Sequence, residues 1–250
     1  MQPDALDGWL AESFRLSFIG LSNWTQRAVF AEISGVQPAL ITAQPMVLLH
    51  QEAGSVSHAH LNIVQQANRV DLVLGDKPTL NTLDPNAPGY KAFFSIGPYR
   101  ENLELFDSLV AQAIPLVSSA LRMAVAITLI RETTNARESI RCLHRLAPNL
   151  PIDPNNDLDL IFQINRPTHN AQGLLINRLA KWEALQVTTV QVGVGAVPMP
   201  IVPSRPPVTA AQIYIDVSTD AERSSPLNNL SEIVSELRGQ AVKLAEAGVA

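Results

Sequence analysis

Three histidines that could bind a metal ion fall close together in the first third of the chain: His50, His58 and His60. Imidazole nitrogens are common zinc ligands, and three of them can hold a zinc ion with an open fourth position. A single residue separates His58 from His60, so on a β-strand both side chains would project from the same face. His50 would join them from the neighbouring strand. The alternative is three polar neighbours on a sheet surface, and we predict neither a metal nor another cofactor.

Other residues with chemical potential have simpler interpretations. Asp157 and Asp159 share a predicted strand face and could bind a cation or act as acid and base, but they follow a Pro/Asn turn, where aspartate is common. Cys142 and His144 lie on one predicted helix, and a cysteine nucleophile would need a base reached through space. The segment 193–195 has two glycines but no helix after it to bind phosphate. We therefore predict that the chain is not an enzyme.

The elements that position these residues are predicted from hydrophobic periodicity. Apolar residues alternate in the strands and recur every three or four residues in the helices. The first half reads strand, helix, three strands and long helix, over residues 14–20, 23–35, 46–51, 57–65, 69–75 and 101–118. The second half repeats this order over residues 121–131, 135–147, 158–166, 184–194, 212–218 and 227–244.

The repeated order predicts an α+β protein made of two β-α-β-β-β-α units, residues 1–118 and residues 119–250. Each predicted strand has one apolar face, so we expect antiparallel sheet with helices packed on one side. Two such units can join edge to edge and hide two free edges. The order resembles the duplicated helix-grip and TATA-binding-protein type of fold. The alternative is two ferredoxin-like modules in tandem.

The bulk composition narrows the class of function. The chain has 250 residues, a net charge of −5 and scattered basic residues, whereas nucleic-acid binding needs a concentrated positive field. The single Cys142 cannot form an internal disulfide and fits a reducing compartment. The sequence shows no basic leader and no apolar stretch long enough for a bilayer. We expect a soluble, cytoplasmic protein without membrane contact.

Two insertions distinguish the halves and are the expected places for binding. Residues 76–99 are rich in turn formers and aromatic residues, and residues 198–207 are rich in proline. Long loops on a rigid sheet often carry binding, and a proline-rich segment can dock in an aromatic groove. The alternatives are a local core under the first loop and a stiff hairpin extension in the second. The predicted interaction residues of the two loops are Phe93, Phe94, Tyr99, Pro200, Ile201, Pro203 and Arg205.

The last predicted helix carries a narrow apolar stripe that includes Leu230, Val234 and Leu237. Ser225 is its predicted N-cap, and Pro226 is the first helical residue. The stripe could contact a partner helix, and a stripe or a free sheet edge readily forms a symmetric dimer. Core packing alone is the alternative.

These features favour a non-catalytic protein-interaction, assembly or regulatory subunit that binds a protein partner or itself. The alternative is a carrier of a hydrophobic small ligand, which the helix-grip likeness implies. Its cavity would lie between long helix and sheet, lined by residues such as Met123, Val125, Phe162 and Ile213. Nucleic-acid binding on the polar sheet face is ranked third, because that face is predicted to carry acidic and neutral side chains.

The second half also resembles a sporadically distributed bacterial family of about this length. The residues that carry the resemblance are the strand and helix from Arg122 to His144, then FQINRP at 162–167, then IYIDV at 213–217 before the terminal helix. The resemblance implies a bacterial or phage-related origin and an accessory role. That family has no assigned activity, so no functional residues are transferred from it.

Overall fold

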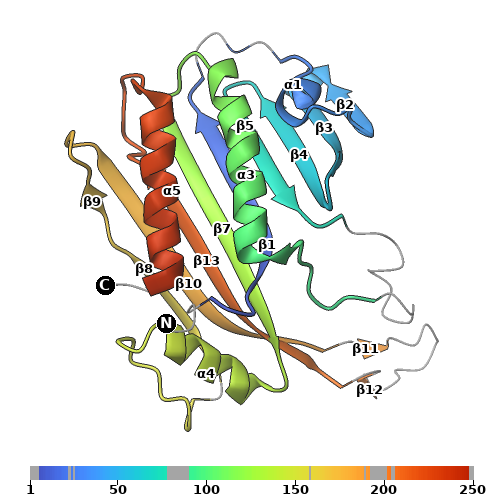
Figure 1. The fold of residues 1–250 in the computed structure, drawn as a ribbon, viewed down its shortest axis with the longest axis vertical. Coiled ribbons are helices and arrows are strands. Elements are labelled where there is room, and N and C mark those ends of the chain that lie inside the picture. The colour runs from blue at the N-terminus through green and yellow to red at the C-terminus, as the bar shows by residue number, and fades with distance from the viewer. Residues whose placement is uncertain are drawn as a thin grey trace.

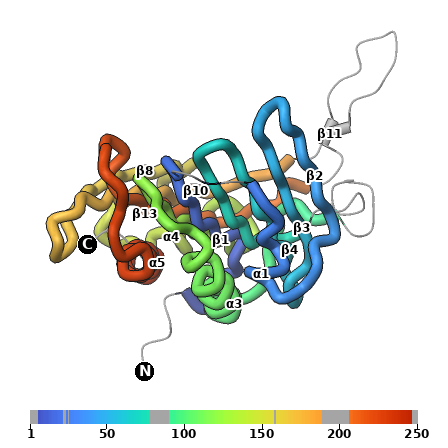
Figure 2. Tube along the Cα trace, turned by 90° about the horizontal axis from the view of Figure 1, so that it is seen from above, coloured from blue at the N-terminus to red at the C-terminus, as the bar shows by residue number. Residues whose placement is uncertain are grey.

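The computed structural model shows an α+β protein in which helices pack on one face of an antiparallel sheet, so the predicted fold class is confirmed (Figure 1). The structure describes residues 6–21, 24, 26–77, 90–157, 159–188, 190–191, 202–203 and 206–247. Turned by 90°, the molecule shows its helices gathered on one side of the sheet (Figure 2). Within the described residues, no helix is both long and apolar enough to span a membrane.

Nine strands form one continuous antiparallel ladder, with β2 at one edge and β8 at the other. Across the sheet they are β2 (Leu40–Gln44), β3 (Leu49–Val56), β4 (Ala59–Gln66), β5 (Arg69–Gly75), β1 (Leu10–Ile19), β7 (Arg122–Thr133), β13 (Val208–Thr219), β10 (Leu175–Val187) and β8 (Ile161–Asn165). Two short strands extend the sheet, β6 (Gly97–Pro98) beside β1 and β9 (Thr168–His169) beside β10. A separate two-stranded ladder joins β11 (Val190–Gln191) to β12 (Val202–Pro203).

The second half supplies the predicted order of strand, helix, three strands of five residues or more, and helix, whereas the first half has a fourth such strand, β2, which was not predicted. The helices are α1 (Phe30–Ser34) and α3 (Tyr99–Ala113) in the first half, and α4 (Ala136–Leu146) and α5 (Leu230–Ala247) in the second. The halves join edge to edge through β1 and β7, where Phe14 lies opposite Ile127. They share one hydrophobic core. The division at residues 118 and 119 falls between α3 and β7, and it stays a prediction, as does an origin by duplication.

The core lies between the sheet and its helices. On β1 the side chains of Phe14, Leu16 and Phe18 are fully buried, as alternation requires of a strand with one covered face. The Phe14 ring stacks on Tyr99 and Phe106 of α3, with ring centroids 6.3 and 5.2 Å apart. These aromatic contacts fix α3 across the centre of the sheet.

Helices α3 and α5 run antiparallel over the sheet and are joined by two ion pairs (Figure 1). Arg238 donates from Nε and Nη2 to the two carboxylate oxygens of Asp107, at 3.1 and 2.5 Å. Near the other ends of the helices, Arg100 lies 2.7 Å from Glu246. Such a two-point bridge fixes the register of one helix against the other.

The predicted helix over residues 23–35 is wrong for most of its length, because only α1 forms. Side chains from β3 and β4 bind the preceding backbone instead. Gln65 accepts from Arg27 N at 3.3 Å and donates to Arg27 O at 2.7 Å. The buried Glu52 carboxylate accepts from Val29 N at 2.7 Å and from Phe30 N at 3.0 Å. These bonds replace helical ones until α1 begins.

Several predicted boundaries are also wrong. The predicted strand at 46–51 contains part of a 3-10 turn (Pro45–Val47) before β3, and the chain reverses at residues 57–58 before β4. Strand β10 begins nine residues before the predicted 184, whereas residues 192–194 lie outside the described residues. Helix α3 ends at Ala113, before Pro115, which lacks a helical N–H donor. Helix α5 begins at Leu230, so Ser225 and Pro226 precede it instead of capping it.

Candidate interaction surface

The three histidines do not come together. His50 lies beside the buried Glu52, with Nε2 3.8 Å from its carboxylate, whereas His58 sits in the β3–β4 turn with Nε2 2.9 Å from Oδ1 of Asn102 on α3. His60 alternates with the core residue Leu61, so it projects from the opposite sheet face. The predicted shared face of His58 and His60 is therefore wrong. Among the described residues, no three metal-ligating side chains are grouped.

The remaining candidates for chemistry serve local structure. Asp153 closes a surface turn by accepting from Asn155 N at 3.0 Å, and its own N–H donates to Asp157 at 2.8 Å. Cys142 is buried on α4, and burial raises the pKa of its thiol. A thiol that stays protonated is a poor nucleophile.

The sheet face that carries no described helix is polar and internally paired. Arg15 of β1 crosses Ala126 of β7 and donates to Asp216 of β13 at 2.8 Å. Tyr214 donates to the same carboxylate at 3.1 Å. The pKa of the Tyr214 phenol is raised, mainly by burial and secondly by the negative charge of Asp216. The small side chain at Ala126 leaves room for the arginine to lie flat on the sheet.

Other charges on this face also find partners within the chain. Arg69 pairs with Asp71 at 2.7 Å, and Lys181 pairs with Glu183. Arg122 donates to Ser218 at 3.0 Å. Because positive and negative groups are interleaved, this face has no concentrated positive field of the kind that nucleic acid requires.

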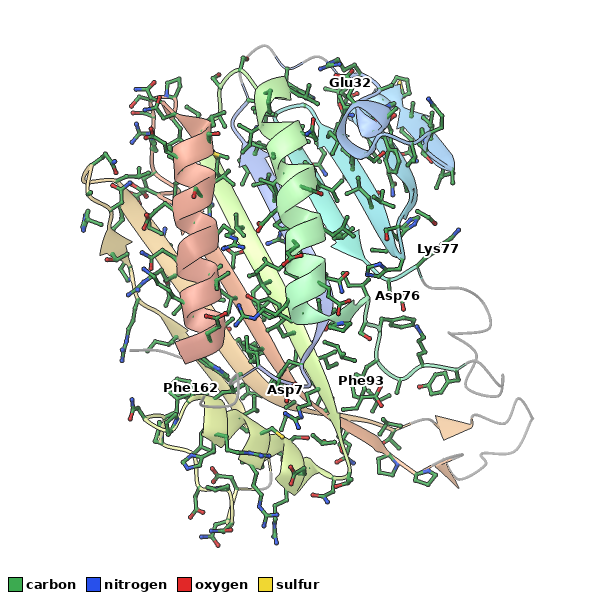
Figure 3. All side chains as sticks on the ribbon, viewed as in Figure 1. Asp7, Glu32, Asp76, Lys77, Phe93 and Phe162 are labelled. Atoms are coloured by element: carbon green, nitrogen blue, oxygen red, sulfur yellow. The ribbon has the colours of Figure 1, made fainter. Side chains whose placement is uncertain are left out.

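The described aromatic residues of the first insertion differ in their burial. Phe93 and Phe94 are half-buried on the segment that leads from β5 to α3, where Lys91 pairs with Asp76 at 2.8 Å (Figure 3). Tyr99 is buried against Phe14. Tyr99 thus belongs to the hydrophobic core, whereas Phe93 and Phe94 do not, so the local-core alternative for these two residues stays a prediction. Residues 78–89 lie outside the described residues.

The other predicted contact residues are either buried or outside the described residues. On α5, Leu230, Val234 and Leu237 belong to the core, which supports the core-packing alternative. In the proline-rich insertion, Pro200, Ile201 and Arg205 lie outside the described residues. The backbone of Pro203 pairs with Val190 in the β11–β12 ladder.

The residues expected to line a ligand cavity fill the core. Met123, Val125 and Ile213 are fully buried, and the Phe162 ring packs 6.0 Å from that of Trp182. Two surface clefts of about 520 and 580 Å³ lie near the start of α5, and none of these four residues lines either cleft. Neither cleft therefore lies at the place that the carrier hypothesis requires.

A surface that sequence reasoning missed lies along edge strand β2. Six of the seven large hydrophobic residues exposed among the described residues fall between positions 36 and 48. Met46 is the most exposed, at 97%, and the others range from 45% to 64%. We name this set the β2 edge patch: Val36, Leu40, Ile41, Met46, Val47 and Leu48.

The tip of the patch is held in a costly conformation. Pro45 begins a 3-10 turn that Leu48 closes, with Leu48 N donating to Pro45 O at 3.2 Å. Leu48 has φ of 50°, in the left-handed region that leucine rarely occupies. Gln26 donates to Leu48 O and holds the turn in place. A strained turn that presents three apolar side chains to solvent is a common mark of a functional segment.

The edge strand is short and flanked by Pro38 and Pro45, but it lacks the charged side chains that usually help to prevent association. In the described residues β2 pairs with β3 alone, so its other side is a free sheet edge (Figure 1). Residues 36–51 contain no Asp, Glu, Lys or Arg. The opposite edge strand, β8, has charged Asp159 and Arg166 close to its ends and one large exposed hydrophobic residue, Ile161. The uncharged run was visible in the sequence, but its exposure was not.

Comparison with known proteins adds no assignment: no family model, no curated protein and no solved structure matches this chain. The bacterial family resemblance therefore stays a prediction. A functional hypothesis for this chain has to rest on its own geometry, in which the β2 edge patch is the surface least explained by folding alone.

Proposed function

We propose that this chain is a non-catalytic interaction or assembly subunit that binds a protein through the β2 edge patch. The observation that carries the proposal is the coincidence of a free sheet edge with six exposed hydrophobic side chains. Exposed apolar clusters of this kind on folded proteins typically mark interaction sites. A free edge adds unpaired backbone groups to which an incoming strand can bind.

The size of the patch suits a specific contact. Each patch side chain exposes an area on the order of 100 Å², or roughly 600 Å² in all, against about 800 Å² per partner in a standard interface. The neighbouring polar residues and the strand backbone would supply the remainder. Burial of Met46, Val47 and Leu48 would also offset the strain stored in the turn.

Two further parts of the proposal have indirect support. A non-catalytic role is supported by the paired charges of the open sheet face and by the raised pKa of the Cys142 thiol. A cytoplasmic setting is supported by the use of one buried, unpaired cysteine. The carrier and nucleic-acid hypotheses have less support, because neither described cleft lies between the long helix and the sheet residues named above, and the charges of the polar face are paired.

The test compares charged variants at the two sheet edges. We would replace Leu40 and Met46 together by Lys, with Ile161→Lys at the other edge as the matched control. Hydrogen exchange of the β2 amides would be measured in the particle isolated from its own cells and in dilute purified chain. We expect protection of β2 in the native particle that the double variant loses and the control keeps. Equal exchange in particle and dilute chain would refute the proposal.

A further inference from the structure

We propose that the partner of the β2 edge patch is a second copy of this chain, which pairs β2 with β2 in antiparallel fashion about a two-fold axis at Thr42. This inference rests on the proposed function and names its partner. It follows from the charge, the position and the symmetry of the patch.

The charge of the edge permits self-pairing. Residues 36–51 have no charged side chain apart from any protonated His50, so two copies brought together would meet no like charges along the strand. A charged partner segment would gain no ion pair here, because the edge offers none. A neutral, apolar edge is complementary to another neutral, apolar edge. A second copy of the chain presents the same edge, so a symmetric pair can form.

The alternation of the sheet requires that the axis pass through a residue of β2, and the extent of the patch indicates which one. An antiparallel neighbour related by two-fold symmetry requires an axis perpendicular to the sheet, which keeps the helices of both copies on the same face. Side chains opposite one another must share a face, so the residue on the axis pairs with itself. The patch spans residues 36–48, and its middle residue is Thr42.

This register covers the patch of each copy with β2 and its flanking residues from the other copy. With Thr42 opposite its own copy, Leu40 lies opposite Gln44, and Ile41 lies opposite Ala43. The tip from Met46 to Leu48 then falls beside the segment from Val36 to Pro38 of the other copy. Both ends of the patch therefore lie within the contact.

The pairing is closed and limited in length. Pro38 and Pro45 flank β2 and lack N–H donors, so the ladder between copies is confined to the short strand. A symmetric β2–β2 contact uses the free β2 edge of both copies, and the remaining β8 edges have charges near their ends. The expected product is therefore a dimer with one continuous sheet and not a fibre.

Cysteine cross-linking of the full chain tests the register directly. The sole native cysteine, Cys142, is buried, so the wild-type chain is the control without a surface thiol. We expect Thr42→Cys to form a disulfide-linked dimer under mild oxidation at least tenfold faster than Ile41→Cys or Ala43→Cys. Light scattering should show a dimer that Ile41→Lys weakens by about 100-fold or more, while Ile161→Lys leaves it unchanged.

The outcomes separate this inference from the function on which it rests. A Thr42→Cys cross-link with a dimeric mass supports self-pairing. A monomeric mass without a cross-link, together with protected β2 amides in the native particle, overturns self-pairing and leaves a different protein as the partner. A monomer whose β2 amides stay unprotected in the native particle overturns both.

Discussion

Replacing Glu52 should release the segment that precedes α1 from the sheet. The Glu52 side chain is 1% exposed, and its Oε2 atom accepts two backbone hydrogen bonds, from Val29 at 2.7 Å and Phe30 at 3.0 Å. A hydrogen bond to a charged group contributes about 1.5–3 kcal/mol, so Glu52→Ala should lower the free energy of unfolding by about 3–6 kcal/mol. Glu52→Gln keeps the shape of the side chain and an accepting oxygen but loses the charge. It should lower the free energy of unfolding by roughly half as much as Glu52→Ala.

The assay is urea unfolding followed by tryptophan fluorescence, with hydrogen exchange over residues 26–34 as a local readout. Trp24 reports on the same region, because its indole N–H donates to Gln65 at 3.3 Å. The matched control is Glu32→Ala on the exposed surface of α1, where loss of the Arg27 ion pair should cost less than about 0.5 kcal/mol (Figure 3). If Glu52→Ala cost less than about 1 kcal/mol, or left exchange unchanged, the buried carboxylate would not be what holds this segment.

Three further substitutions test buried or strained groups. Tyr99→Phe should raise the free energy of unfolding by about 1 kcal/mol in urea melts, because the buried Tyr99 hydroxyl has no hydrogen-bond partner among the described residues; a loss of stability would reveal a hidden partner. Burial raises the pKa of Glu12 above its ordinary 4.5, and a hydrogen bond from Gln212 offsets part of this rise. The folded chain thus binds that proton more tightly, and stability falls as pH rises from 4.5 through the folded pKa. Glu12→Gln should remove this fall and be the more stable protein at neutral pH; parallel stability profiles from urea melts across that range would contradict the assignment. Leu48→Gly should raise the free energy of unfolding by up to about 1 kcal/mol, because glycine adopts the positive φ of this position without strain. The same substitution should weaken association, because it removes an exposed apolar side chain. Urea melts test the first effect and light scattering tests the second, and an unchanged result in either assay would contradict the corresponding expectation.

The sequence predicted most reliably those elements whose pattern is local. In β7, Met123, Val125, Ile127 and Leu129 take every second position and are all buried, as are Ile213, Ile215 and Val217 in β13. The failure at residues 23–35 has a distant cause, because the backbone there is bound by Glu52 and Gln65 from two other strands. Strand β10 has apolar residues at both parities in its first half, so alternation could not find its start.

The candidate surface was missed for a different reason. The run from Met46 to Leu49 has the composition of a buried strand, and Leu40 with Ile41 would look equally at home in a core. Their exposure follows from the position of β2 at the end of the ladder, which is set by the pairing of nine strands and not by any local pattern. The predicted loops were chosen for their length and prolines, which indicate a surface position but not an apolar one.

The broad polar face of the sheet is a poorer place for a protein partner than the narrow β2 edge. A partner that covered the face would desolvate the pairs Arg15–Asp216 and Arg69–Asp71. The desolvation free energy of a buried ion pair can exceed the attraction between its charges, so covering this face would be unfavourable. A strand added at β2 desolvates no described ion pair, gains backbone hydrogen bonds and removes apolar side chains from water. The face can therefore remain in water because Arg15 lies across Ala126 and finds its counter-charge within the chain, whereas the edge gains by association. This difference in desolvation cost is the physical reason to locate assembly at β2.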